Sequence, residues 1–155
     1  MRILILVCCL LVSVVEAAQK PIVIIISMDG VPHYIADNPL LTAFKRMEKY
    51  GIKADHLTPV YQSTTYPSHV SMATGVYPDR HGILHNSFID TQQGRFNYDA
   101  DANWIEVPPI WVLAEQQGIK SAVFFWVGSE TDWHGVGASY RKAPFDPNIK
   151  EEQKI

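Results

Sequence analysis

The sequence has little cysteine and no excess of positive charge. Its two cysteines, Cys8 and Cys9, are neighbours close to the N-terminus, so the rest of the chain has no thiolate for catalysis or metal binding. Thirteen Lys and Arg against 16 Asp and Glu give a net charge of −3, which does not favour a nucleic-acid polymer as partner. With 47% hydrophobic residues, the 155-residue chain has the composition of one globular domain rather than a disordered or coiled-coil protein.

No apolar stretch reaches the roughly 20 residues that a transmembrane helix needs. The apolar run at 3–15 follows Arg2 and is followed by small residues. This is the layout of a secretory signal peptide at residues 1–17, cleaved after Ala17, and the alternative is a buried N-terminal strand or helix. We therefore expect a secreted or periplasmic protein. The lack of any Asn-x-Ser/Thr site, together with the scarcity of cysteine, favours a bacterial one.

Apolar runs alternate with segments of helical period. Residues 21–27 form a continuous β-branched run, typical of a strand buried on both faces. The pattern predicts further strands at 54–58 and 121–126, an exposed hairpin or loop at 88–98, and helices from Asn38-Pro39 to Gly51, from Pro67 to Thr74, and from Pro109 to Gly118. The sequence thus predicts an α/β fold with a mostly parallel sheet flanked by helices.

The C-terminal residues 150–155 have the pattern of the first turns of a helix without a C-cap. A sheet of about three strands would also leave a long apolar edge unpaired. We therefore expect residues 18–155 to be the N-terminal part of a larger domain.

Two segments lie where predicted strands end, which is where α/β proteins place their sites. Asp29 follows the first strand and could bind a cation, although an Asp-Gly turn is the simpler interpretation. Thr65 precedes a predicted helix start, where free N–H groups favour an anion, although an ordinary Thr N-cap is equally compatible. A Thr hydroxyl needs a base or a metal to act as a nucleophile, and Asp29 with a metal would supply that activation.

Together these segments resemble the nucleotide pyrophosphatase/phosphodiesterase family of the alkaline phosphatase superfamily, and bacterial-type members most. The resemblance runs in order along 18–155 through Ser27-Met28-Asp29-Gly30, Thr65-Tyr66-Pro67-Ser68-His69, the stretch 74–83, Asn86, 109–112 and 124–130.

The resemblance implies zinc-dependent hydrolysis of phosphodiester or pyrophosphate bonds in small nucleotide-type substrates. Asp29 matches a zinc ligand, and Thr65 matches the nucleophile, which contacts the same zinc and forms a phospho-threonine intermediate. Asn86 matches the residue that holds a phosphoryl oxygen, and Tyr66 matches a position that stacks on a nucleotide base. A complete site of this family holds two Zn²⁺ ions.

The remaining zinc ligands of the family match nothing in this sequence, so we expect them beyond Ile155. His81 is expected to be structural, His69 to be packed or solvated, and Asp132 and His134 to lie in a loop. Two alternatives stay open: a truncated chain without catalytic activity, or a related hydrolase such as phosphonoacetate hydrolase.

Overall fold

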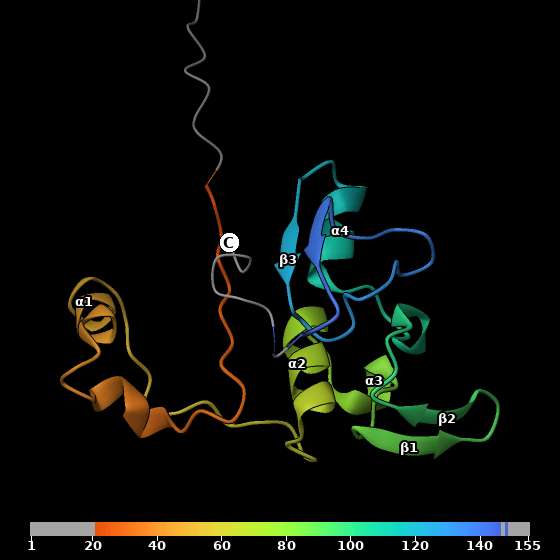
Figure 1. Cartoon of the computed structure of the whole chain (residues 1–155), viewed down its shortest axis with the longest axis horizontal. Helices are drawn as coiled ribbons and strands as arrows, with labels where there is room; N and C mark the ends of the chain where they lie inside the picture. Colours follow the sequence, from red (N-terminus) through yellow and green to blue (C-terminus); the bar gives the residue numbers. More distant parts are fainter. Residues whose placement is uncertain (1–20, 147, 149–155) are drawn as a thin grey trace, which may run out of the picture.

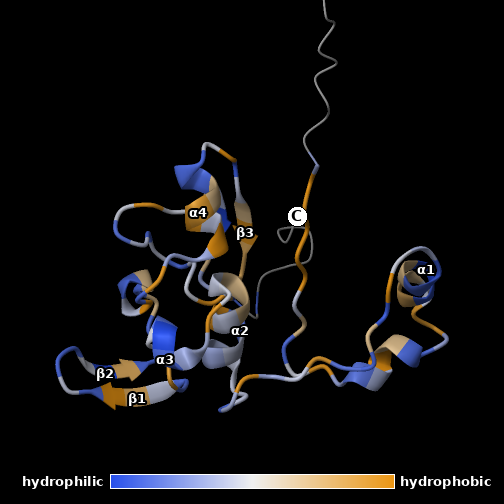
Figure 2. Ribbon diagram, turned by 180° about the vertical axis from the view of Figure 1, so that it is seen from behind, coloured by the Kyte–Doolittle hydropathy of each residue, from blue (hydrophilic) through white to orange (hydrophobic). Residues whose placement is uncertain are grey.

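The computed structural model of the chain describes residues 21–146 and 148. The predicted signal peptide at 1–17 and the predicted helix start at 150–155 lie outside the described residues. Figures 1 and 2 show α1 and the segments around it standing apart from a packed group that contains the other helices and the strands. The elements are η1 (His33–Asp37), α1 (Thr42–Tyr50), α2 (Thr65–Thr74), α3 (Pro78–His81), β1 (Ser87–Asp90), β2 (Gly94–Asn97), η2 (Ala102–Trp104), α4 (Ile110–Gln116), β3 (Ala122–Phe124) and β4 (Tyr140–Lys142).

The described strands form two small sheets. β1 and β2 make an antiparallel hairpin in which Phe88 faces Phe96, and β3 and β4 pair in parallel with Val123 opposite Arg141. The predicted α/β class is confirmed. The hairpin predicted at 88–98 is present, but it is not wholly exposed, because the Phe96 side chain is 1% exposed in the core.

Helix α2 lies at the centre of the packed group and contributes to two apolar clusters. Tyr66 and Val70 pack with Ile83 and Phe96 in one cluster, and Ala73 packs with Trp111 and Val112 in the other. The helix ends as predicted at Thr74, because Gly75 adopts a left-handed conformation with φ 72° and donates its N–H to Ser71. Both faces of α2 are thus held in place.

Two predicted strands are wrong. Residues 21–27 and 54–58 have no regular secondary structure, and their apolar side chains are exposed, with Ile22 at 88% and Leu57 at 77%. A strand forms only where a neighbour takes up its backbone hydrogen bonds, and no described strand lies beside either segment. The third predicted strand is shorter than 121–126 and is not buried, because the two-stranded sheet leaves Phe124 50% exposed.

The predicted start of the first helix is also wrong. The Asn38 N–H donates to the Ile35 carbonyl at 3.1 Å and closes η1, while the Asn38 side chain accepts from the Leu40 N–H at 3.0 Å. Asn38 and Pro39 therefore form a turn between η1 and α1, which begins at Thr42. The helices that begin after Thr64 and Pro109 occur close to where the sequence predicts them.

The Glu115 carboxylate joins α4 to both strands of the parallel sheet. It accepts hydrogen bonds from the backbone N–H and the hydroxyl of Ser121, before β3, and from the same groups of Ser139, before β4. These bonds favour the ionised form, so they lower the pKa of Glu115 from 4.5 to about 2.

We predict that Glu115→Gln lowers the midpoint of thermal unfolding at pH 7, because hydrogen bonds to a charged acceptor are stronger than those to a neutral one. The folded pKa lies below the unfolded one, so this stabilisation is complete above about pH 4.5 and is lost as the pH falls toward about 2. Thermal unfolding followed by circular dichroism across this pH range checks it. Glu106→Gln, at an exposed position, is the matched control. An equal decrease of the unfolding midpoint in both variants at every pH would contradict the role of the Glu115 carboxylate.

Candidate functional site

The structure brings Asp29 and Thr65 together although 36 residues separate them. The Thr65 Oγ1 hydroxyl donates a hydrogen bond to Asp29 Oδ2 at 3.1 Å. Asp29 lies in a turn with Gly30, whose φ of 68° is readily adopted only by glycine, and Thr65 is the first residue of α2. The hydroxyl is thus oriented by a carboxylate at a helix N-terminus.

The N–H groups at the start of α2 are unequally available. The Tyr66 N–H donates to the Asn86 side-chain oxygen at 2.8 Å, Pro67 has no N–H, and the Ser68 N–H donates to the Thr64 carbonyl at 3.2 Å. The Thr65 N–H has no hydrogen-bond partner among the described residues. This donor is next to the Thr65 hydroxyl and at the positive end of the helix dipole, so an anion at this position would contact both.

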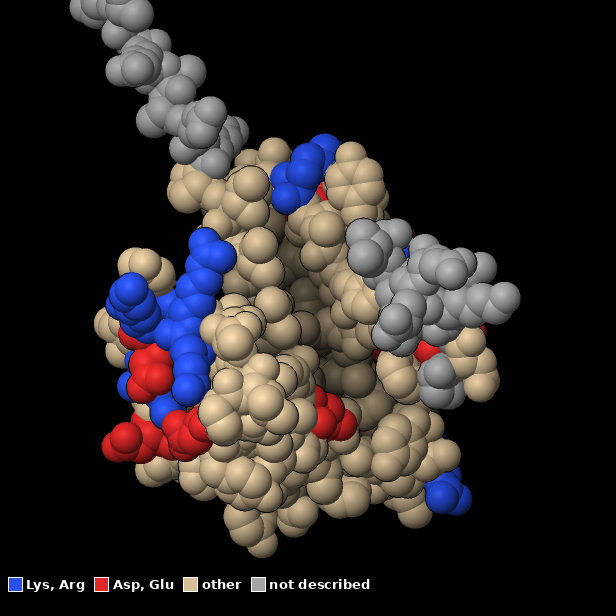
Figure 3. Space-filling view, turned by 60° about the vertical axis from the view of Figure 1, so that its left-hand side comes forward, with Lys and Arg blue, Asp and Glu red and all other residues tan. Residues whose placement is uncertain are grey.

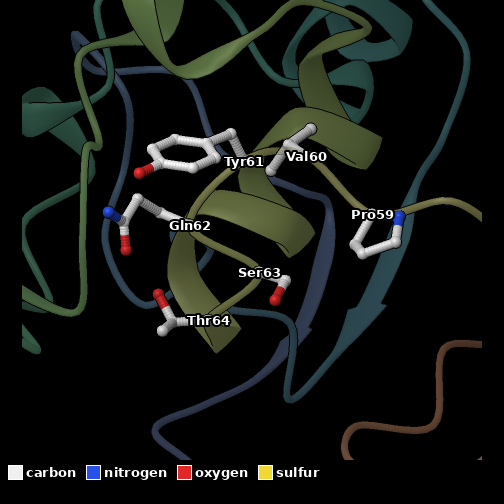
Figure 4. Close-up of a pocket in the computed structure, with 6 residues that line it drawn as sticks. All are labelled: Pro59, Val60, Tyr61, Gln62, Ser63 and Thr64. Carbon is white, nitrogen blue, oxygen red and sulfur yellow. The ribbon is translucent and has the colours of Figure 1, made fainter.

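A tight turn sets the direction from which the chain enters α2. The Thr64 N–H donates to the Gln62 carbonyl at 2.6 Å, which closes a γ-turn around Ser63. Gln62, the first residue of this turn, adopts φ 63°. Residues 59–64 line an open pocket beside the helix start, and the Gln62 amide and the Thr64 hydroxyl point toward one another in Figure 4. The side chains that line this pocket are uncharged, and Asp29 is not among them.

Asn86 is held between α2 and the hairpin. Its oxygen accepts from the Tyr66 N–H, and its NH₂ group donates to the Tyr98 hydroxyl at 3.1 Å. The Tyr98 N–H also donates to the Asn86 carbonyl at 2.9 Å. These bonds fix which end of the amide faces the helix, and one N–H of the Asn86 side chain is left for another acceptor.

Tyr66 lies between α2 and the hairpin. Its side chain is 7% exposed and lies edge-on to both Phe96 and Tyr98, with ring centroids 5.4 and 5.6 Å apart. Burial raises the pKa of Tyr66 to about 12. Packing of α2 on the hairpin thus covers most of the ring, while the neighbouring Tyr98 ring is exposed, and the stacking role of Tyr66 stays a prediction.

Two histidines of the described chain have clear positions. His81 is fully buried, accepts the Ile83 N–H on Nδ1, and bonds Ser71 through Nε2, so it is structural as predicted. Burial lowers its pKa. His69 is half-buried, with one ring nitrogen 2.9 Å from the Ser27 hydroxyl and the other 2.8 Å from the Thr65 carbonyl.

The contacts of His69 and Tyr98 were not predicted from the sequence. The i, i+4 spacing of Thr65 and His69 on one helix was visible in the sequence and could have indicated a contact. The Ser27 contact depends on how the segment at 21–30 crosses α2, and the Tyr98 contact depends on the register of the hairpin. Neither leaves a local pattern in the sequence.

The Asp29 carboxylate and the Thr65 hydroxyl fit as part of a metal site. Two oxygens that bind one tetrahedral zinc at about 2.0 Å lie about 3.3 Å apart, close to the 3.1 Å between these atoms. Between residues 21 and 146, and at 148, no group of three or more His, Cys, Asp or Glu side chains could hold a metal ion. Asp132 lies in a loop, as predicted, and its carboxylate forms an ion pair with Arg141 at 2.8 Å. The described residues therefore offer two neighbouring oxygens, fewer than the three or more ligands of a stable zinc site.

Figure 3 shows a hollow on one face of the molecule. Its interior is lined by uncharged side chains, with an acidic group at its edge and Lys and Arg side chains at the rim and toward one side. No helix among the described residues has the length and apolar character required to cross a membrane.

Comparison with known proteins points to one family. The sequence model described as type I phosphodiesterase / nucleotide pyrophosphatase matches residues 23–155. The human ectonucleotide pyrophosphatase/phosphodiesterase family member 1 is 33% identical over 144 residues, covering 88% of this chain and 16% of the relative. Venom phosphodiesterase 2 of Crotalus adamanteus is 32% identical over 149 residues, covering 88% of this chain and 18% of the relative. The chain thus spans about one sixth of the length of these relatives.

A solved structure supports the same fold. Human ectonucleotide pyrophosphatase/phosphodiesterase 5 superposes with a TM-score of 0.75 at 26% identity, covering 83% of this chain and 36% of that one. The match thus corresponds to about a third of that solved chain. The relatives named here are eukaryotic, so a bacterial origin stays a prediction.

We predict that Asn86→Ala lowers the free energy of unfolding by about 1 kcal/mol, because the Tyr66 N–H loses an acceptor that acts like an N-cap. Asn86→Asp keeps that acceptor and adds negative charge at the helix N-terminus, so it should retain the stability. Urea unfolding of the two variants measures the difference. Equal destabilisation by both substitutions would contradict this role of the amide oxygen.

Proposed function

We propose that this chain, which belongs to the type I phosphodiesterase / nucleotide pyrophosphatase family, supplies the nucleophile side of a phosphodiester-hydrolysing site. Residues 18–155 would form the N-terminal part of the catalytic domain. The substrates would be small phosphodiesters or pyrophosphates of the nucleotide type. The observation that carries the proposal is the Thr65 hydroxyl, oriented by Asp29 at the N-terminus of α2.

Thr65 Oγ1 would attack the phosphorus atom and form a phospho-threonine. The hydrogen bond to Asp29 Oδ2 directs the hydroxyl proton toward a carboxylate oxygen, which leaves a lone pair free for the attack. The bond from phosphorus to the leaving oxygen breaks, and that oxygen takes up a proton. The oxygen of a water molecule then bonds to phosphorus, the bond between phosphorus and Thr65 Oγ1 breaks, and the proton that water loses passes to Oγ1, which regenerates the hydroxyl and releases the phosphate monoester.

Two donors would hold the phosphoryl oxygen that gains charge during attack. The Thr65 N–H is one, because it has no partner among the described residues and belongs to the attacking residue itself. The second is the N–H of Asn86 that does not bond Tyr98, since the amide is already fixed by the Tyr66 N–H and the Tyr98 hydroxyl. Donors that are fixed before the reaction stabilise the developing charge without reorganising.

Asp29 and Thr65 would also be the residues of this chain that bind zinc. Bound zinc would neutralise phosphate charge and lower the pKa of the hydroxyl. The proposal places the other ligands in a part of the protein that follows residue 155. A leader peptide at 1–17 would direct the protein to a secreted or periplasmic location, and the names of the relatives as ectoenzymes and venom enzymes support this.

We predict that Thr65→Ala in the complete catalytic domain reduces hydrolysis of a p-nitrophenyl nucleotide ester to background, because the covalent step loses its nucleophile. Thr65→Ser keeps a hydroxyl and should retain measurable turnover. The neighbouring Thr64 hydroxyl is buried and has no hydrogen-bond partner in the part of the chain that the structure describes, so Thr64→Ala is the matched control and should keep its activity. Steady-state kinetics and circular dichroism of these three variants distinguish a loss of catalysis from a loss of folding.

Retained activity in Thr65→Ala together with its loss in Thr64→Ala would move the nucleophile by one residue and contradict the proposal. Activity toward phosphonoacetate but not toward nucleotide esters would favour the alternative of a phosphonoacetate hydrolase.

We also predict that the isolated 155-residue chain does not hydrolyse this ester and retains less than one zinc per chain after dialysis. One carboxylate and one hydroxyl hold zinc weakly, since stable protein sites use three or more ligands. Metal analysis by inductively coupled plasma mass spectrometry, beside the ester assay with added zinc, measures both quantities. Turnover with two zinc ions per chain would show that the site is complete without further residues.

A further inference from the structure

His69 connects the segment that carries Asp29 to the helix that carries Thr65. On α2, its Nδ1 lies 2.8 Å from the Thr65 carbonyl, and its Nε2 lies 2.9 Å from the hydroxyl of Ser27, two residues before Asp29. The ring also packs edge-on against Trp126 at 5.6 Å, and the Trp126 Nε1–H donates to the His69 carbonyl at 3.1 Å. Three segments therefore meet at this residue.

The partners of the ring determine where its proton lies. A backbone carbonyl can only accept, so Nδ1 carries the hydrogen that bonds Thr65. In the neutral ring, Nε2 is then an acceptor, and the Ser27 hydroxyl donates to it. Both ring nitrogens are engaged, so His69 has no free lone pair for a metal while these bonds persist.

The segment at 21–31 depends on few contacts for its position. Its apolar residues are exposed from Ile22 to Ile26, and no described strand pairs with it. Among the hydrogen bonds between described residues, two join it to α2: Ser27 to His69, and Thr65 to Asp29. The second of these would have to break or rearrange during attack by Thr65, whereas the first involves no reacting atom.

We propose that His69 is a positioning residue for the reaction of the proposed function. By holding Ser27 through Nε2 and the Thr65 carbonyl through Nδ1, it keeps the Asp29 carboxylate against the Thr65 hydroxyl at the first turn of α2. The expected change in kcat rests on the proposed function, whereas the hydrogen bonds of His69 can be tested without any activity. A displacement of about 1 Å between reacting groups costs on the order of 100-fold in rate, so the loss of this clamp should lower kcat.

The kinetic test compares His69→Phe, Ser27→Ala and the double variant in the complete catalytic domain, with the exposed His56→Phe as matched control. We expect His69→Phe to lower kcat about 10- to 100-fold with little change in KM. Ser27→Ala should have a smaller effect and should add nothing in the His69→Phe background, because the two residues act through one bond. His69→Asn keeps a donor near the Nδ1 position and should recover part of kcat.

Several outcomes would overturn the proposal. One is an unchanged kcat in His69→Phe while Thr65→Ala is inactive, and another is independent, additive effects of Ser27→Ala and His69→Phe. If His69→Phe fails to fold, Ser27→Ala decides the matter, because it removes only a hydroxyl. If the wild-type protein shows no hydrolysis, the proposed function is refuted. The hydrogen bonds of the His69 ring are then tested by a second measurement.

That measurement is the ¹⁵N spectrum of the histidine rings, which needs no activity. We expect neutral His69 to carry its proton on Nδ1 and expect the Nε2 resonance to shift in Ser27→Ala but not in a Thr64→Ala control. A proton on Nε2, or an unchanged Nε2 resonance in Ser27→Ala, would contradict the clamp.

Discussion

The first turn of α2 carries the hydrogen bonds on which the site depends. A helix start leaves N–H groups without intrahelical partners, and here the Asn86 amide takes one of them while the Thr65 N–H stays available. Asp29 and His69 attach a second, otherwise exposed segment to the same turn. Because α2 packs in both apolar clusters, its orientation is fixed, and the groups around Thr65 take their positions from it.

Local patterns predicted the parts of the fold that depend on local interactions. Gly75 ends α2 through its left-handed conformation, and the helix after Pro109 and the hairpin at 88–98 follow their turn and helix signals. The strands predicted at 21–27 and 54–58 are not formed, because a strand needs a neighbour that the sequence of the strand itself does not reveal. Their exposed apolar side chains would suit coverage by other parts of a larger domain.

The candidate site was predicted by the motifs at 27–30, 65–69 and 86, and the structure brings Asp29, Thr65 and Asn86 to one helix end. The stacking role of Tyr66 is implied by the resemblance alone and stays a prediction for a ring that is 7% exposed. The bond of His69 to Ser27 and the bond of Tyr98 to Asn86 come from the way separate segments meet, which no spacing in the sequence encodes.

The most direct test of the account is to find the covalent intermediate. The complete catalytic domain would be mixed with a nucleotide ester, quenched in acid within one turnover and digested, and its peptides would be analysed by mass spectrometry. We expect a single phosphorylated peptide with the modification on Thr65, which disappears as turnover ends. Modification of another residue in this peptide, or turnover without any covalent phosphoryl group, would contradict it.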